Sequence, residues 1–336
     1  MSAYPELSTI HETATRLHGK VLQTPVWQWQ TGIVAEQLLP QTEVWLKLEM
    51  LQKTGTFKLR GALNCIEALD TEAKSRGVVA VSAGNHAIAV AYASAVAGTH
   101  AKVVMLEKSS PARIAACKAS GAEILLAPDI HQAFAWAKQI AEDESRTMIH
   151  PFEGPLTALG TATVGLELMQ QVPQLDAVIV PIGGGGLCAG IAAAVKQINP
   201  ACAVYGIEPE GANSMSRSLQ AGQPEKLESV STVADSLGAP FALPYSFGVC
   251  QRFVDEVVTV SDDDLCRAMY YLFRDMKLVT EPATAASTAA LLGPLKTRLN
   301  GKKVGLIVCG ANIDAGRYSE LLLRGQTLAD ATTNTD

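Results

Sequence analysis

The chain has 336 residues, of which 48% are hydrophobic and 18% are charged. This composition excludes a disordered chain, a collagen and a disulfide-rich scaffold. The 27 basic and 33 acidic residues give a net charge of −6, and no run of lysine or arginine occurs. We therefore expect neither nucleic acid nor an anionic membrane as a partner. With about 150 residues in a typical domain, the length allows one large unit or two lobes.

The cysteine pattern and the N-terminal segment bear on the compartment. Seven cysteines occur, an odd number, and no two of them have CxxC spacing. This pattern is typical of reduced thiols and disfavours a cysteine-based zinc site. The first 16 residues, MSAYPELSTIHETATR, carry acidic side chains and no apolar core, unlike a signal peptide. We therefore predict a cytoplasmic protein.

In chain order, short β-branched segments alternate with stretches rich in alanine and leucine. We predict strands over residues 44–49, 78–82, 101–106, 122–127, 177–182, 203–208, 256–260 and 303–310. Helices are predicted between most of them, for example over 86–98, 111–121 and 131–145. Alternation of this kind predicts an α/β fold in which mostly parallel sheets carry helices on both faces. Residues 77–101 and 177–195 contain no charge, but glycine-containing breaks interrupt both, so we expect no membrane span.

The first motif that suggests chemistry is KTGTFKLRGALN, residues 53–64, which follows a predicted strand. Thr54 and Thr56 favour a helix start and place Lys58 in the first turn. The positive end of the helix dipole disfavours an ammonium there and so favours a neutral amine, which a Schiff-base lysine requires. A solvated surface lysine is the alternative that the local pattern leaves open.

The second motif is SAGNHA, residues 82–87, between a predicted strand and a helix. Small residues at a helix N-terminus let backbone amides approach an anion, and a carboxylate is the natural ligand. Asn85 and His86 add side-chain donors. An ordinary helix cap, with His86 merely packed at the helix start, is equally open.

The third motif, PIGGGGLCAG, spans residues 181–190 and joins a predicted strand to a helix. Consecutive glycine amides form a nest for phosphate oxygens, and no lysine follows as in a nucleoside-triphosphate loop. A second interpretation is open, because Gly184, Gly186 and Ala189 satisfy GxGxxA and Glu208 follows about twenty residues later. That pattern is typical of a dinucleotide-binding loop.

Two further motifs occur near the C-terminus. Glu281 precedes a proline and a run of small helix formers within KLVTEPATAAS, residues 277–287. Cys309 ends a predicted strand within LIVCGANID, residues 306–314, where open α/β sheets place ligands. Simple helix capping by Glu281 and a buried, inert Cys309 are the alternatives. Taken together, the five motifs supply an amine, a carboxylate loop and a phosphate nest, a set that suits pyridoxal phosphate.

The ordered set of five motifs resembles the signature segments of the fold-type II pyridoxal-phosphate enzymes, in particular the threonine/serine dehydratase (ammonia-lyase) family, which includes serine racemase. The resemblance covers roughly residues 15–325. It implies that the cofactor is bound by Phe57, Lys58, Asn85, Gly183, Gly184, Gly185, Gly186, Leu187, Glu281 and Cys309. It implies a substrate-binding loop formed by Ser82, Ala83, Asn85 and His86.

The resemblance also assigns individual roles. Lys58 corresponds to the lysine that carries the cofactor and takes the Cα proton, and Phe57 to a residue packed on the cofactor ring. Cys309 corresponds to the position that faces the pyridine nitrogen, and Glu281 to a glutamate near the ring edge. A large domain is implied over residues 1–68 and 153–326, a small mobile domain over 69–152 and a polar tail over 327–336, without a C-terminal regulatory domain.

Three positions depart from the family pattern. Residues 159–163 read LGTAT where the family usually has AGQGT, so substrate contacts there are open. Glu208 and Ala212 match two of the ligands with which some members bind a divalent cation, but the third is Ser214 instead of a carboxylate, so we regard a cation as doubtful. Ala83 stands where serine racemases have the serine that returns a proton to Cα.

The resemblance therefore implies α,β-elimination from a β-hydroxy amino acid, giving a 2-oxo acid and ammonia, in a homodimer or homotetramer. The substrate side chain stays open between threonine, serine, hydroxyaspartate and phenylserine. An amino-acid racemase of the same fold is one alternative. A nicotinamide-dependent (NAD) oxidoreductase and an inactive ligand-binding homologue are alternatives of other classes, and neither of them needs Lys58.

Overall fold

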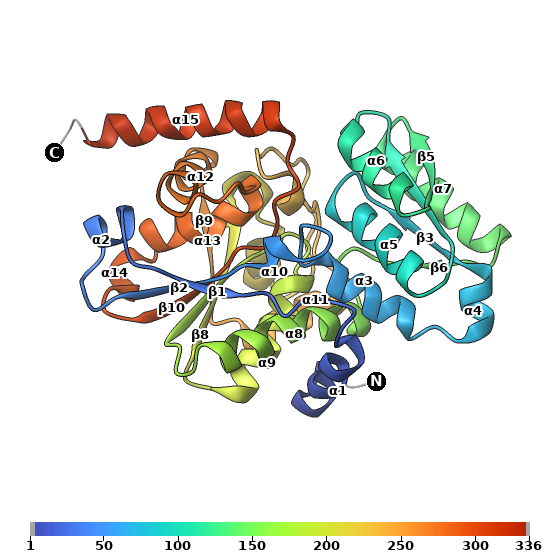
Figure 1. Ribbon diagram of the computed structural model, residues 1–336, viewed down its shortest axis with the longest axis horizontal. Coiled ribbons are helices and arrows are strands. Elements are labelled where there is room, and N and C mark those ends of the chain that lie inside the picture. The colour runs from blue at the N-terminus through green and yellow to red at the C-terminus, as the bar shows by residue number, and fades with distance from the viewer. Residues whose placement is uncertain (1–3, 334–336) are drawn as a thin grey trace.

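A computed structural model describes residues 4–333, which form two β-sheets with helices on both faces of each. In Figure 1 the strands β3 to β6 and the helices α4 to α7 gather at one end of the molecule, and most other elements lie at the opposite end. Helix α3 lies between the two groups. No helix among the described residues is both long and apolar enough to cross a bilayer.

The larger sheet has six strands in the order β1-β2-β10-β7-β8-β9. They are β1 (Val26–Trp29), β2 (Glu43–Lys47), β7 (Ala177–Pro181), β8 (Ala203–Pro209), β9 (Glu256–Val260) and β10 (Lys303–Ile307). All neighbours pair in parallel except β1 and β2, which are antiparallel. The central strands are apolar on both sides because helices cover both faces.

Two groups of helices enclose this sheet. On one face α8 (Pro155–Gln171), α9 (Gly186–Ile198) and α11 (Pro244–Phe253) form a core with the sheet. On the other face α12 (Asp262–Met276), α13 (Pro282–Leu292) and α15 (Ala315–Thr333) form a second core. The other helical elements of this part are α1 (Leu7–Leu17), α2 (Ile33–Gln37), η1 (Glu49–Leu51), η2 (Glu210–Ala212), α10 (Ser214–Ala221), η3 (Asp235–Leu237) and α14 (Lys296–Leu299).

The smaller sheet is wholly parallel, in the order β5-β4-β3-β6. Its strands are β3 (Val78–Val81), β4 (Ala101–Leu106), β5 (Glu123–Ala127) and β6 (Thr147–Met148). Helices α5 (Asn85–Val96) and α6 (Pro111–Ala119) pack with α3 (Lys58–Glu67) on one face, and α7 (Ile130–Asp143) packs on the other. Helix α4 (Thr71–Arg76) connects α3 to this sheet.

The α/β class and all eight predicted strands are confirmed, with ends that differ by up to three residues. Strands β1 and β6 were not predicted, because one is short with alternating polar residues and the other has two residues. The expected polar tail differs as well: α15 continues through residue 333, and residues 334–336 lie outside the described part. The boundaries proposed for two domains remain an expectation, while the small sheet itself lies within residues 78–148.

Candidate active site

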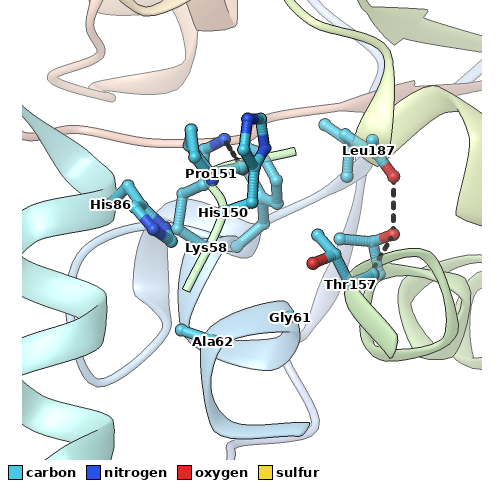
Figure 2. A pocket seen from close by; sticks show the side chains of 11 residues that line it. Lys58, Gly61, Ala62, His86, His150, Pro151, Thr157 and Leu187 are labelled. Atoms are coloured by element: carbon cyan, nitrogen blue, oxygen red, sulfur yellow. Dashed lines mark hydrogen bonds between the residues drawn. The ribbon is translucent and has the colours of Figure 1, made fainter. Parts of the chain in front are cut away.

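Lys58 is the first residue of α3 and lines a small pocket together with Phe57, His86, His150 and Leu187. Its Nζ donates a hydrogen bond to the carbonyl oxygen of Pro151 over 2.6 Å. Figure 2 shows His86, His150 and Pro151 gathered around this side chain. Burial lowers the pKa of Lys58 to about 8, against the opposing influence of Cys309 and Glu281. A larger share of the amine is therefore neutral near physiological pH than in an ordinary lysine, and an attacking or proton-accepting amine must be neutral.

Two histidines face the amine. Burial, reinforced by the charge of Lys58, lowers the pKa of His86 to about 3 and that of His150 to about 4. Both rings are therefore neutral at physiological pH. The Nε2 of His86 lies 2.8 Å from the carbonyl oxygen of Ile149 and is engaged there. Our expectation that the His86 ring is a free donor for a carboxylate is not supported by this geometry.

The loop before α5 offers backbone amides instead. The N–H of Gly84 donates to Ser82 Oγ over 3.1 Å, which fixes the turn. Within residues 4–333, no hydrogen bond from the backbone amides of Ala83, Asn85 and His86 is present. These unpaired N–H groups at a helix N-terminus retain the anion-binding property predicted for residues 82–87.

The side chain of Asn85 belongs to a network that crosses the molecule. Its Nδ2 donates to Glu281 Oε1 over 2.7 Å, and its Oδ1 accepts from Asn312 Nδ2 over 2.8 Å. Ser236 Oγ donates to the other Glu281 oxygen over 3.1 Å. Burial raises the pKa of Glu281 above its ordinary value, although the Arg113 guanidinium opposes this. Glu281 therefore orients Asn85 and does not cap its own helix.

The four glycines form the expected loop between β7 and α9. Gly185 has a φ of +94°, in the left-handed region that favours glycine. A Cβ at Gly186 would lie 2.3 Å from the carbonyl oxygen of Phe152, so only glycine allows this approach. No hydrogen bond from the backbone amides of residues 183–187 occurs in the described structure. This loop has the geometry of an anion nest, and Thr161 Oγ1 secures it by donating to the Gly186 carbonyl over 2.7 Å.

Phe57 and Cys309 complete the pocket's surroundings. The Phe57 amide donates to the Cys309 carbonyl over 3.1 Å, and the Phe57 ring centre lies 5.1 Å from Lys58 Nζ. Burial, with a further contribution from Glu281, raises the pKa of Cys309 to about 12. Its thiol lies 3.3 Å from Thr284 Oγ1 and stays protonated at physiological pH.

At the candidate cation site, the carboxylate of Glu208 binds backbone amides. Both oxygens of Glu208 accept backbone N–H groups, from Met215 and Ser216, over 2.8 Å each. Glu208 therefore caps α10, with a pKa that burial raises to about 7. Both oxygens are thus engaged, which disfavours the dinucleotide interpretation, in which this carboxylate binds a ribose. Across residues 4–333, no group of three or more His, Cys, Asp or Glu side chains could hold a metal ion.

Three contributors to the site were not singled out from the sequence: Ser236, Asn312 and His150. Asn312 belongs to the motif LIVCGANID, and His150 precedes a proline in the segment HPFEGP, between the predicted helix over 131–145 and the predicted strand over 177–182. Ser236 carried no local signal. Its link to the site comes from tertiary structure, because 45 positions separate it from Glu281.

The family model, the relatives and the solved structures that match this chain all indicate the same family. The family model described as "Pyridoxal-phosphate dependent enzyme" matches residues 19–310. A phenylserine dehydratase of Ralstonia pickettii is 50% identical over 318 residues, which cover 95% of this chain and 96% of the relative. The catabolic L-threonine dehydratase of Escherichia coli K12 is 36% identical, with 94% and 95% covered. The structure of maize serine racemase has a TM-score of 0.88 at 36% identity and covers 96% of this chain and 99% of that one.

Proposed function

Because the chain belongs to the family of pyridoxal-phosphate dependent enzymes, we propose that it is an ammonia-lyase acting on a β-hydroxy amino acid. The substrate loses its Cα proton and its β-hydroxyl as water, and the unsaturated amine then reacts with water to give a 2-oxo acid and ammonia. The observation that carries the proposal is the Lys58 amine, with its pKa lowered to about 8, in one pocket with the glycine loop.

The residues present fit the cofactor. The unpaired amides of residues 183–187, with left-handed Gly185, suit the three oxygens of a phosphate. The neutral amine of Lys58 suits an aldehyde, and Phe57 supplies an apolar surface for a ring. When bound, pyridoxal phosphate withdraws electron density from Cα of the attached amino acid. Lys58, Phe57, Asn85, Glu281, Cys309 and residues 183–187 are the proposed cofactor ligands.

We assign separate roles to the side chains and backbone amides of the site. Lys58 Nζ accepts the Cα proton, since its lowered pKa leaves a larger share of the amine unprotonated near neutral pH than in an ordinary lysine. The amides of Ala83, Asn85 and His86, together with Ser82, bind the substrate carboxylate. Asn85 is held in one orientation by Glu281 and Asn312, so its amide presents a fixed dipole to the cofactor.

The choice between elimination and racemisation depends on proton donors. Racemisation needs an acid on the face opposite Lys58, and Ala83 has no proton to give at the position expected for it. The protonated Cys309 thiol, with a pKa of about 12, is also too weak an acid to keep a pyridine nitrogen protonated. A cofactor ring held against this thiol would withdraw electrons less strongly, which would favour prompt loss of the β-hydroxyl over reprotonation at Cα.

Among the open substrates we propose phenylserine first. The Phe152 ring lies against Gly184, because a Cβ there would be 2.3 Å from it. Phe152 packs edge-on against His150 with ring centres 4.6 Å apart, and the ring centres of Phe152 and Phe241 are 6.3 Å apart. This aromatic surface next to the Lys58 pocket suits a phenyl substituent. The relative that is 50% identical is named a phenylserine dehydratase.

The test combines a spectrum with product analysis. We expect the purified holoenzyme to be yellow and to release 2-oxo acid from phenylserine, threonine or serine at least about tenfold faster than it forms the D-enantiomer or Cα-epimer. Chiral chromatography of the recovered substrate measures the second rate. Equal rates would contradict the argument from Ala83 and favour a racemase. If the enzyme changed the absorbance of added nicotinamide cofactor but released no 2-oxo acid, an oxidoreductase would be favoured.

We expect divalent cations to matter little. Glu208 is engaged with two backbone amides, and the buried Ser214 offers a neutral oxygen where a carboxylate would attract a hard cation. Chelation should therefore change the turnover rate less than about twofold and leave the melting temperature unaltered. A large loss restored by magnesium would contradict this, and a Ser214→Asp variant would show whether a second carboxylate introduces such a response.

The pKa of Lys58 sets the pH dependence of cofactor loading. Only the neutral amine attacks an aldehyde, and the neutral fraction grows as pH rises through the pKa. With a pKa of about 8, the initial rate of loading into apoprotein should rise between pH 7 and 9 and then level off. Absorbance of the Schiff base against pH measures it, with free Nα-acetyl-lysine as the control. A rate still climbing above pH 10 would show an unperturbed lysine.

We also propose where the enzyme is located, how it assembles and how its domains divide. The cysteine pattern supports a cytoplasmic enzyme. We propose a homodimer or homotetramer, as the resemblance implies, which light scattering would measure. We also propose that residues 69–152 form a small domain that moves relative to residues 1–68 and 153–326.

A further inference from the structure

Arg113 is the charged side chain of α6 that faces the carboxylate loop. Its Nη2 donates to the carbonyl oxygen of Asn312 over 2.6 Å. Its Nη1 approaches Gly84, since a Cβ on that glycine would lie 3.4 Å away. Its Nε is buried and has no hydrogen-bond partner. The guanidinium thus lies beside the loop with donors that the described residues do not use.

The charges around the loop leave a carboxylate poorly compensated. His86 and His150 are neutral because burial lowers their pKa to about 3 and about 4, and the Lys58 amine, proposed to attach the cofactor, is engaged by the Pro151 carbonyl. The nearby carboxyl group of Glu281 is buried. Backbone amides supply partial charges only. The substrate carboxylate therefore needs a full positive charge, and Arg113 is the one that the structure places beside the loop.

We propose that Arg113 binds the substrate α-carboxylate, with its guanidinium closing over the amides of residues 83–86. This inference rests on the proposed function and adds a substrate-binding residue to it. A planar guanidinium matches a carboxylate with two parallel N–H donors, which a lysine ammonium does not. Because Arg113 also bonds to Asn312, which holds Asn85, carboxylate binding and the orientation of Asn85 share one set of contacts.

A second, exposed contact joins the same two segments. Ser110 Oγ donates to Asp314 Oδ1 over 2.7 Å. It ties the start of α6 to the segment after β10, as Arg113 does through Asn312. Ser110→Ala therefore weakens the packing between these segments while leaving the loop's charge unchanged, and it separates packing from carboxylate binding.

The experiment measures binding instead of turnover. The probe is 2-methyl-L-serine, which has no Cα proton and cannot be eliminated, and the comparison ligand is its carboxamide, which lacks the negative charge. Spectral titration of the holoenzyme gives both dissociation constants. We expect Arg113→Met to weaken the acid roughly tenfold to a hundredfold and the amide less than twofold, since a hydrogen bond to a charged group is lost. Arg113→Lys should lie between the wild type and Arg113→Met.

Two controls keep the result decisive. Lys118→Met removes a charge from an exposed position on the same helix and should change neither constant. Ser110→Ala should change the dissociation constants of the acid and the amide by the same factor, or leave both unchanged. Equal weakening of acid and amide by Arg113→Met would assign Arg113 to packing, and no weakening would remove it from the site. Should Arg113→Met fail to fold, Arg113→Lys with the same two ligands decides. A wild-type holoenzyme that bound neither ligand would instead overturn the proposed function.

Discussion

Replacing Lys58 by alanine is expected to lower turnover of every β-hydroxy amino acid by roughly 10³-fold or more, because one group supplies both the cofactor attachment and the base. The variant should still bind free pyridoxal phosphate, since the glycine loop is untouched. Borohydride reduction of the wild-type holoenzyme, followed by peptide mass spectrometry, should place the reduced cofactor on Lys58.

Lys53 provides the matched control, because it belongs to the same sequence motif. Its Nζ donates to the carbonyl of Gly19 over 3.1 Å at an exposed position, away from the pocket. Lys53→Ala should keep the yellow colour and the turnover rate within about twofold. Recovery of the reduced cofactor on any lysine other than Lys58, or substantial turnover by Lys58→Ala, would contradict the assignment.

The sequence was informative where function depends on local backbone. The SAGNHA and GGGG loops each combine a strand end, small residues and a helix start, and the structure finds unpaired amides at both. Glycine at residue 186 could be expected there because a close backbone approach excludes a side chain, and the carbonyl of Phe152 supplies that approach.

Side-chain directions were less predictable than loops. The bond between Asn85 and Glu281 joins residues 196 positions apart, and nothing local specifies it. His86 was expected to present a free donor, but the tertiary position of Ile149 engages its ring. A helix start fixes where backbone amides point, whereas a side chain finds its partner only after distant elements have packed.

The predicted strand over residues 44–49 also carries a signal for a buried ion cluster. Lys47 and Glu49 occupy alternate positions at the end of the apolar segment VWLKLE, and both side chains are fully buried. Arg60, two residues after Lys58, is fully buried as well. Charged residues are rarely buried unless they are paired, so two of them on one side of an apolar strand indicate an internal ion cluster.

The cluster has two cations and two carboxylates. Arg60 donates to Glu49 through Nε and Nη2, over 2.8 Å each, and to Glu167 through Nη1 over 2.6 Å and Nη2 over 2.8 Å. Lys47 Nζ donates to Glu167 over 2.6 Å. Burial lowers the pKa of Arg60, but the carboxylates of Glu49 and Glu167 together outweigh it and raise the pKa above its ordinary value. The cluster joins β2 and η1 to α8 through Arg60, which lies in the first turn of α3, the helix that begins at Lys58.

Arg60→Met should reduce the free energy of unfolding by about 3–5 kcal/mol, because it leaves the carboxylate of Glu49 buried without its main partner. Urea denaturation of the apoprotein measures the loss. Arg76→Met is the matched control: its ion pair with Glu72 is largely solvent-exposed, and we expect a change of about 1 kcal/mol or less. A loss of similar size in both variants would show that the buried cluster contributes no more than a surface pair.

The double variant Arg60→Met with Glu49→Gln separates pairing from packing. Removing the carboxylate as well leaves no uncompensated buried charge, so part of the loss should be recovered relative to Arg60→Met alone. If instead the two losses added, the contacts of each side chain with Leu22 and Thr24 would matter more than the charge between them.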